Sequence, residues 1–255
     1  MENVQNTIKN ADQLNLEGTT KMPLEQVKKL DPKGRLVYWI RERESIRLKK
    51  LQGLPKPWTN DKILSSFRFC NVRRLDDKVS DWLLLNWYQP FFNHKNMVIA
   101  AVLARHFNQP STLARIGFPE GKFIPNAKYV ANLDWYEYIH DAKAAITSIK
   151  LRGDSTAFNN AYIIRADGKF PNKVDMVFDE TVQQFVDDPP DLNTDSMEMC
   201  VEELMHYRNI GSFMAGQICA DLRWAWKANG LTKTTGQQWD QVVNSPIFNE
   251  AIDSS

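Results

Sequence analysis

Apolar residues recur at steps of three and four positions through most of the chain, which is the spacing of amphipathic helices. The first such helix begins at Gly34 and ends before Gly53 and the prolines that follow it. Thr59 is expected to cap the second helix. The segment 96–107 (NMVIAAVLARHF) is apolar almost throughout, so it predicts a central buried helix. The helices expected after the first one span 62–67, 76–88, 96–107, 135–149 and 173–185.

One segment, 161–170 (AYIIRADGKF), has the β-branched and turn residues of a hairpin. The predicted fold class is therefore mainly α, with at most a small β-hairpin. Residues 1–33 are polar and are expected to form an N-terminal arm. Residues 34–230 are expected to form one helical domain, and 231–255 a polar C-terminal segment.

Composition excludes several classes of protein. With 32 Lys and Arg against 31 Asp and Glu, the formal net charge of +1 excludes a strongly basic protein that coats DNA. No apolar run approaches the roughly 18 residues of a membrane span, and the N-terminus lacks the apolar core of a signal peptide. The 3 cysteines and 4 histidines have no metal-ligand spacing, so no metal site and a cytoplasmic location are expected. No glycine-rich phosphate loop is present, and no cofactor is predicted.

The segment 204–224 (LMHYRNIGSFMAGQICADLRW) predicts a helix, a tight turn and a second helix. Asn209, Gly211 and Ser212 lie in or beside the turn. A glycine there permits positive φ and lets backbone N–H groups approach a phosphate. These three residues are therefore candidate DNA contacts. An ordinary helical hairpin whose turn contains a glycine explains the pattern equally well.

Asp221 follows the apolar sequence QICA and precedes Leu222. A carboxylate in partly apolar surroundings can act as a base or stabilise a cationic centre. Asp221 is therefore a candidate catalytic residue. The alternative is a helix cap, or a surface carboxylate paired with Arg223.

The segment 67–77 (FRFCNVRRLDD) places adjacent arginines and adjacent aspartates among aromatic and aliphatic residues. Arginine suits bidentate binding of phosphate, and aspartate can orient an arginine or an amine. Asp76 is a second candidate catalytic residue, and the candidate substrate-binding residues here are Asn71, Arg73, Arg74 and Asp77. A structural ion-pair network is the alternative. The charged run 41–50 (RERESIRLKK) predicts a solvated helix face, or a phosphate-contacting face if it adjoins this segment.

Other candidates lie outside these two segments. Arg105 and Asn108 end the apolar helix and either stabilise its C-terminus or point into a substrate-binding site. Lys173 is a candidate catalytic residue as a phosphate ligand or amine partner, or it is simply solvated. Aromatic residues beside polar motifs can stack on an extruded base. These aromatic candidates are Trp58, Trp82 and Tyr162.

Six motifs carry a resemblance to a known family. They are ERE at 42–44, KPWT at 56–59, FCNVRRLDDKVSDW at 69–82, LARHFNQPSTLARIG at 103–117, AYII at 161–164 and IGSFMAGQICADL at 210–222. Together they resemble the alpha-glutamyl/putrescinyl thymine pyrophosphorylase family, over roughly residues 36–224. That family is similar to helix-hairpin-helix DNA glycosylases and to the helical domain associated with hydroxymethyluracil DNA kinases. The resemblance implies a glycosylase-like helical catalytic domain.

The resemblance implies a bacteriophage enzyme acting in the host cytoplasm on DNA that carries pyrophosphorylated hydroxymethyluracil. It would replace the pyrophosphate of 5-pyrophosphoryloxymethyl-uracil with an amino acid or a polyamine. The residues implied around the flipped base and its leaving group are Asn71, Arg73, Arg74, Asp76, Asp77, Arg105, Asn108, Lys173 and Asp221. Rival functions are a DNA glycosylase and a non-catalytic DNA-binding partner of a hydroxymethyluracil DNA kinase. The region after 224 lacks the GPG segment of the family.

Overall fold

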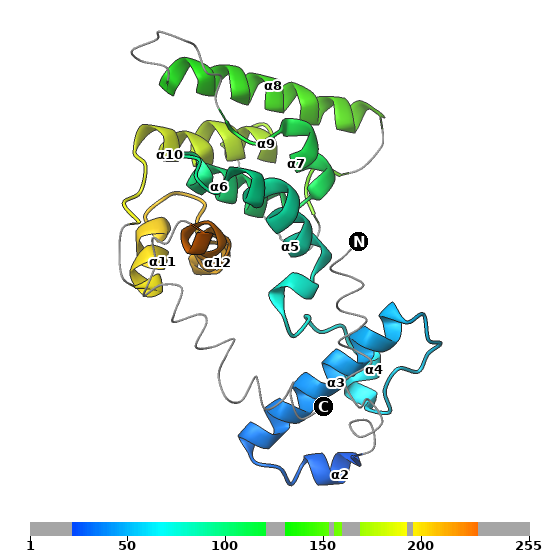
Figure 1. Ribbon diagram of the computed structural model, residues 1–255. Coiled ribbons are helices and arrows are strands. Elements are labelled where there is room, and N and C mark those ends of the chain that lie inside the picture. The colour runs from blue at the N-terminus through cyan, green and yellow to red at the C-terminus, as the bar shows by residue number, and fades with distance from the viewer. Residues whose placement is uncertain (1–21, 121–130, 153–155, 160–168, 193–195, 229–255) are drawn as a thin grey trace. The chain divides into compact units, whose positions relative to one another are not determined.

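The computed structural model describes residues 22–120, 131–152, 156–159, 169–192 and 196–228 (Figure 1). Every regular element within these ranges is helical, which confirms the mainly α fold class. The chain divides into two compact units, Met1–Asp77 with Trp239–Ser255, and Lys78–Gln238. This division falls within the range that was expected to form one domain. The segment expected to form a β-hairpin lies almost wholly outside the described residues.

The first unit is built on α3 (Pro32–Leu51). Asp31 caps this helix by accepting a hydrogen bond from the Gly34 N–H at 2.7 Å, and Pro32 occupies the first position, where no N–H is needed. The other elements of this unit are α2 (Leu24–Val27), α4 (Lys62–Ser66) and the 3-10 turn η2 (Arg74–Asp76).

The cap of α4 is not the residue that the sequence pattern indicated. Asp61 accepts hydrogen bonds from the N–H groups of Ile63 and Leu64 at 2.8 and 3.1 Å. Thr59 instead donates to Glu42 Oε2 at 2.6 Å. The prediction of Thr59 as cap is wrong because α4 begins at Lys62, so the cap position falls on Asp61, and Thr59 Oγ1 accepts from the Asp61 N–H at 3.1 Å, before the helix begins.

The second unit is a group of helices around α6 (Met97–Phe107), which packs against α12, α7 and the π-helical turns η3 and η5 (Figure 1). Ten of the eleven residues of α6 are buried, which confirms the predicted central helix. The expected helices over 76–88 and 173–185 are present, but each continues into a π-helical turn. The elements are α5 (Lys78–Trp82), η3 (Leu83–Tyr88), η4 (Gln89–Phe91), α6, α7 (Pro110–Ile116), α8 (Ala131–Arg152), α9 (Lys173–Asp175), η5 (Met176–Val182), α10 (Gln183–Asp187), α11 (Met197–Met205) and α12 (Ser212–Ala228).

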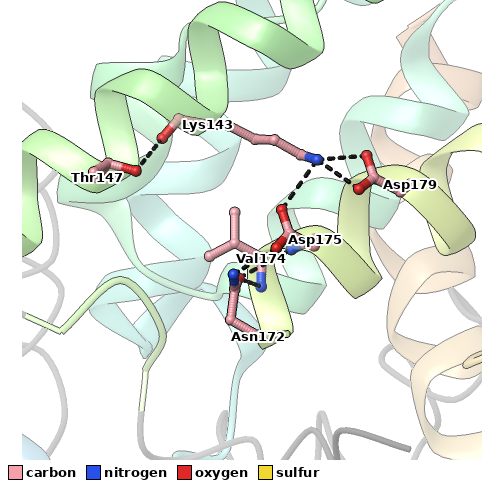
Figure 2. Close-up of polar contacts among 6 residues, drawn as sticks. All are labelled: Lys143, Thr147, Asn172, Val174, Asp175 and Asp179. Carbon is pink, nitrogen blue, oxygen red and sulfur yellow. Dashed lines mark hydrogen bonds and ion pairs between the residues drawn. The ribbon is translucent and has the colours of Figure 1, made fainter. Parts of the chain in front are cut away.

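A lysine ties the long helix α8 to α9 and η5 (Figure 2). Lys143 Nζ lies 3.1 Å from Asp175 Oδ1 and contacts both oxygens of Asp179 at 2.5 and 2.6 Å. Asn172 caps α9 by accepting from the N–H of Val174 at 2.9 Å. This geometry makes residue 173 the first position of α9.

We expect Gly216→Ala to raise the free energy of unfolding by about 0.5–1 kcal/mol, because glycine loses more backbone entropy than alanine in a helix interior. A Cβ at Gly216, within α12, would meet no heavy atom within 4 Å. Urea unfolding followed by circular dichroism measures the change. The contrasting variant is Gly34→Ala, whose Cβ would lie 2.9 Å from Asp31 Oδ1, so it should destabilise. A Gly216→Ala protein no more stable than the wild type would contradict the helical placement of this residue.

Candidate functional site

In the first unit, two carboxylates and two arginines form one cluster. Arg47 donates to Glu44 through Nε at 2.9 Å and Nη2 at 2.5 Å, and its Nη1 lies 3.2 Å from Asp76 Oδ1. Arg73 Nη1 reaches Glu44 Oε1 at 3.3 Å. The structure therefore brings two of the predicted residues, Arg73 and Asp76, to the same carboxylate–arginine cluster. Glu44 and Arg47 were not predicted as site residues, although their i, i+3 spacing places them on one face of α3.

The charged run 41–50 is not a solvated helix face over its first half, so that interpretation is wrong there. Glu42, Arg43 and Glu44 are only 1%, 6% and 9% exposed. Arg43 Nη2 donates to the carbonyl of Phe69 at 3.0 Å and to that of Cys70 at 3.2 Å. Burial of these charges is tolerated because each side chain has an oppositely charged or polar partner.

The side chain of Asp76 is largely buried, but it lies in the same cluster as a partly exposed arginine. Burial raises the pKa of Asp76 above its ordinary value, and the positive charges of Arg47 and Arg73 offset only part of this effect. Its Oδ2 accepts no hydrogen bond from the described residues. The Arg73 side chain, by contrast, is 40% exposed. A carboxylate with raised proton affinity therefore shares a cluster with a guanidinium that an anion can reach.

Other predicted site residues of the first unit lie at or near the turn η2. Asn71 Nδ2 donates to the backbone carbonyl of Asp76 at 2.8 Å, which holds the chain around η2. Arg74 is partly buried at the start of η2, and Asp77 is exposed immediately after it. Trp58 is partly buried in the same unit.

In the second unit, Arg105, Asn108 and Asp221 meet in the interior. Arg105 donates to both oxygens of Asp221, through Nε at 2.5 Å and Nη2 at 2.6 Å, and Tyr88 Oη donates to Oδ2 at 2.7 Å. The side chains of Arg105 and Asp221 are 2% and 0% exposed. The alternative of a surface carboxylate is therefore wrong. The catalytic role of Asp221 stays a prediction, and the geometry favours a positioning role.

Two residues complete this buried group. Arg105 Nη1 donates to Asn108 Oδ1 at 3.3 Å, and Asn108 adopts a left-handed conformation (φ 46°) that ends α6. Tyr88, which the sequence analysis did not name, ends η3 with its hydroxyl in the core. A tyrosine on the apolar side of a predicted helix is a weak signal, since its ring alone explains the position.

The connection between α11 and α12 is anchored on η5. Asn209 Nδ2 donates to Glu180 Oε2 and to Thr181 Oγ1, both at 2.9 Å. The positive φ that was expected at Gly211 falls on Asn209 instead (φ 67°), so that expectation is wrong. Asparagine tolerates this conformation, and its side-chain contacts stabilise it. Gly211 and Ser212 are exposed where α12 begins, and the N–H groups of a first helical turn have no partner within the helix.

The remaining candidates are not drawn into either cluster. Lys173 is exposed at the first position of α9 in the second unit. Tyr162 lies outside the described residues. Within the described ranges, no group of three or more His, Cys, Asp or Glu side chains is arranged to hold a metal ion. The helices described for this chain include none with the length and apolar character needed to cross a membrane.

A protein-family model described as 5-hmdU DNA kinase, helical domain, matches residues 33–232. The chain belongs to this family of helical domains. A 5-hmdU DNA kinase of Bacillus phage SP10 is 26% identical over 205 residues, which are 71% of this chain and 29% of the relative. The chain thus spans less than a third of that relative. No solved structure matches the chain. The predicted relationship to hydroxymethyluracil DNA modification is confirmed at the level of this family, in place of the narrower transferase family.

We expect Asp221→Asn to lower the free energy of unfolding by about 3–5 kcal/mol, because it removes the charged partner of the buried Arg105. Tyr88→Phe should cost about 1 kcal/mol, since it removes one hydrogen bond to the same carboxylate. Denaturant unfolding measures both.

The matched control is Asp179→Asn, whose side chain is 43% exposed and whose partner Lys143 keeps Asp175. This variant should stay within about 1 kcal/mol of the wild type. An Asp221→Asn protein that unfolds at the wild-type denaturant concentration would contradict the buried pair.

Proposed function

We propose that the protein replaces the pyrophosphate of 5-pyrophosphoryloxymethyl-uracil in DNA with an amino acid or a polyamine. Membership of the 5-hmdU DNA kinase helical-domain family and the similarity to a phage 5-hmdU DNA kinase support a substrate of this kind. The observation that carries the proposal is the cluster of Asp76 and Arg73. It supplies the two groups that the substitution needs, a base and a cation for the leaving group.

In the reaction, the nitrogen of the amine forms a bond to the exocyclic methylene of the base, and the bond from that methylene to the pyrophosphate oxygen breaks. The amine enters as an ammonium and must lose a proton. Asp76 accepts this proton, because its raised pKa makes it a stronger base than an ordinary aspartate. Pyrophosphate leaves with its electron pair, and Arg73 neutralises the charge that develops. Arg74 is a further candidate for the second task, and the role of Lys173, which lies in the second unit, stays a prediction.

The buried pair of the second unit has a different role in this proposal. Arg105 occupies both oxygens of Asp221, so Asp221 acts as a positioning residue that fixes α12 against α6. The exposed start of α12, at Gly211 and Ser212, then contacts a DNA phosphate through backbone N–H groups. The side chain of Asn209 holds this turn and does not need to touch DNA itself.

Incubation of the protein with a duplex containing pyrophosphorylated hydroxymethyluracil and a panel of amines tests the proposal. Mass spectrometry of the digested nucleosides should show an amine adduct, with one pyrophosphate released for each adduct formed. Abasic sites would indicate a glycosylase instead. Duplex binding with no consumption of the modified base, under all amines, would contradict transfer by this chain and indicate a binding partner of another enzyme.

The pH profile of transfer by Arg73→Gln should separate the two proposed roles. Transfer requires ionised Asp76, so the single-turnover rate should fall as pH decreases through the pKa of Asp76, which burial places above that of an ordinary aspartate. Removing Arg73 takes away a positive charge that favours the ionised carboxylate. The acid limb should therefore move to higher pH, and the plateau rate should fall by about 10²–10³-fold.

Lys62→Gln is the control for the loss of one charge, because Lys62 is exposed on α4 in the same unit. Its profile should match that of the wild type. An acid limb that stays in place in Arg73→Gln would exclude Asp76 as the base. An unchanged plateau would exclude Arg73 as the group that stabilises the leaving pyrophosphate.

Gly211→Ala should weaken duplex binding by about fivefold to tenfold, because a Cβ obstructs the approach of a phosphate to the backbone. The fold should tolerate the change, since a Cβ at Gly211 would meet no heavy atom within 4 Å. Fluorescence anisotropy with two unrelated duplex sequences should show the same loss, because phosphate contacts carry no sequence information. Gly216→Ala is the matched control on the same helix. Equal affinities of Gly211→Ala and the wild type would exclude this contact.

A further inference from the structure

The first unit contains a cleft that the proposed chemistry does not use. Its volume is about 620 Å³, and α3, the Lys56–Thr59 segment and the chain from Leu64 to Asn71 form its walls. Four cationic residues line it, Arg43, Lys50, Lys56 and Arg68, and the lining contains no acidic side chain. The cleft therefore has a positive potential although the whole chain has a net charge of +1.

Two of these cations lie over the ring of one tryptophan. Lys50 Nζ lies 4.7 Å and Lys56 Nζ 5.0 Å from the ring centroid of Trp58. The electron-rich faces of the ring attract two ammonium groups that would otherwise repel each other. The ring is itself held, because Trp58 Nε1 donates to the Leu54 carbonyl at 2.7 Å and its own carbonyl accepts from Lys49 Nζ at 2.8 Å.

The cationic groups of the cleft lie close enough together to lower the pKa of one of them. Desolvation, and then the positive charges of Arg43, Lys56 and Arg68, lower the pKa of Lys50. An anion placed between these groups would relieve their repulsion. Because Arg43 is occupied by the carbonyls of Phe69 and Cys70, the three cations available to a ligand are Lys50, Lys56 and Arg68.

The cleft also presents an aromatic surface. The lining includes Phe67 and Phe69, and Phe67 is 67% exposed directly after α4. An exposed aromatic ring beside a group of cations suits a ligand that alternates flat bases with phosphates. The volume is within the range of small-ligand sites, so it fits a nucleotide or two and not a duplex.

We propose that this cleft binds a short unpaired stretch of a DNA strand, with phosphates held by Lys50, Lys56 and Arg68 and a base stacked on Phe67. The choice of DNA rests on the proposed function, because the strand that carries the modified base must be locally unpaired to expose that base. Asn71 lines the cleft and also donates to the Asp76 carbonyl, so the cleft adjoins the proposed reaction site. The cleft is thus a holding site for the strand next to the reacting nucleotide.

Anisotropy titrations with a labelled, unmodified oligothymidine of six nucleotides test the proposal in the full-length protein. Lys56→Gln and Arg68→Gln should each lower the affinity about tenfold, and each should reduce the slope of log affinity against log salt by about 0.7. Phe67→Ala should lower the affinity about tenfold with the salt slope unchanged, because stacking releases no counterions. Lys29→Gln, exposed in the same unit but outside the cleft, should change neither.

Competition with unlabelled ligands distinguishes DNA from other classes of ligand in the cleft. A poly-glutamate peptide of equal charge that displaces the oligonucleotide as well as unlabelled oligothymidine does would overturn the proposal in favour of an acidic protein. Full affinity in Phe67→Ala together with displacement by inorganic pyrophosphate alone would overturn it in favour of a small polyphosphate. Oligothymidine affinity equal to the wild type in all three cleft variants would exclude the cleft altogether.

The outcome is separable from that of the proposed function, because these titrations use DNA without the modified base. Cleft variants that lose oligothymidine binding, in a protein that transfers no amine, would contradict the transferase and leave the cleft standing. Cleft variants that bind oligothymidine normally, in a protein that transfers amines, would contradict the cleft and leave the transferase standing.

Discussion

The buried ion pair between Arg105 and Asp221 is the interaction on which the second unit depends. Removing two charges from water is costly, and their attraction compensates only when the geometry is close and the remaining hydrogen-bonding capacity is used. Two short contacts between the charges, a third from Tyr88 and the Asn108 amide meet these conditions. Since the partners come from α6 and α12, the pair determines how these helices align.

The first unit also pairs carboxylates with arginines, but these side chains are less deeply buried. Glu44, Arg47 and Asp76 have side chains that are 11%, 13% and 13% exposed, whereas that of Arg73 is 40% exposed. The enclosed members hold α3 against η2, and their burial raises the proton affinity of Asp76. The exposed member is accessible to an anion. Burial and exposure within one cluster thus combine a carboxylate of raised proton affinity with a cation that solvent reaches.

One helix serves two neighbouring sites in this arrangement. Glu44 and Arg47 of α3 belong to the carboxylate–arginine cluster, and Lys50, one turn further on, belongs to the cationic cleft. Asn71 contributes to both, through its amide contact to Asp76 and its place in the cleft wall. If a DNA strand lies in the cleft, the neighbouring base of that strand lies close to the reacting residues of the same unit. Binding and chemistry then share a single rigid support, which favours accurate placement of the reacting atoms.

The sequence by itself determined the helical class and the central helix at 96–107, and it singled out Arg73, Asp76, Arg105 and Asp221 as candidates, because periodicity and residue chemistry are local properties. Tertiary structure decided which partners they meet. Arg105 and Asp221 are 116 positions apart, and no local pattern records that their charges pair in the core. The buried charges at 42–44 look the same in sequence as charges facing water. Packing likewise placed the positive φ on Asn209, where η5 supplies partners, and gathered separate lysines around Trp58.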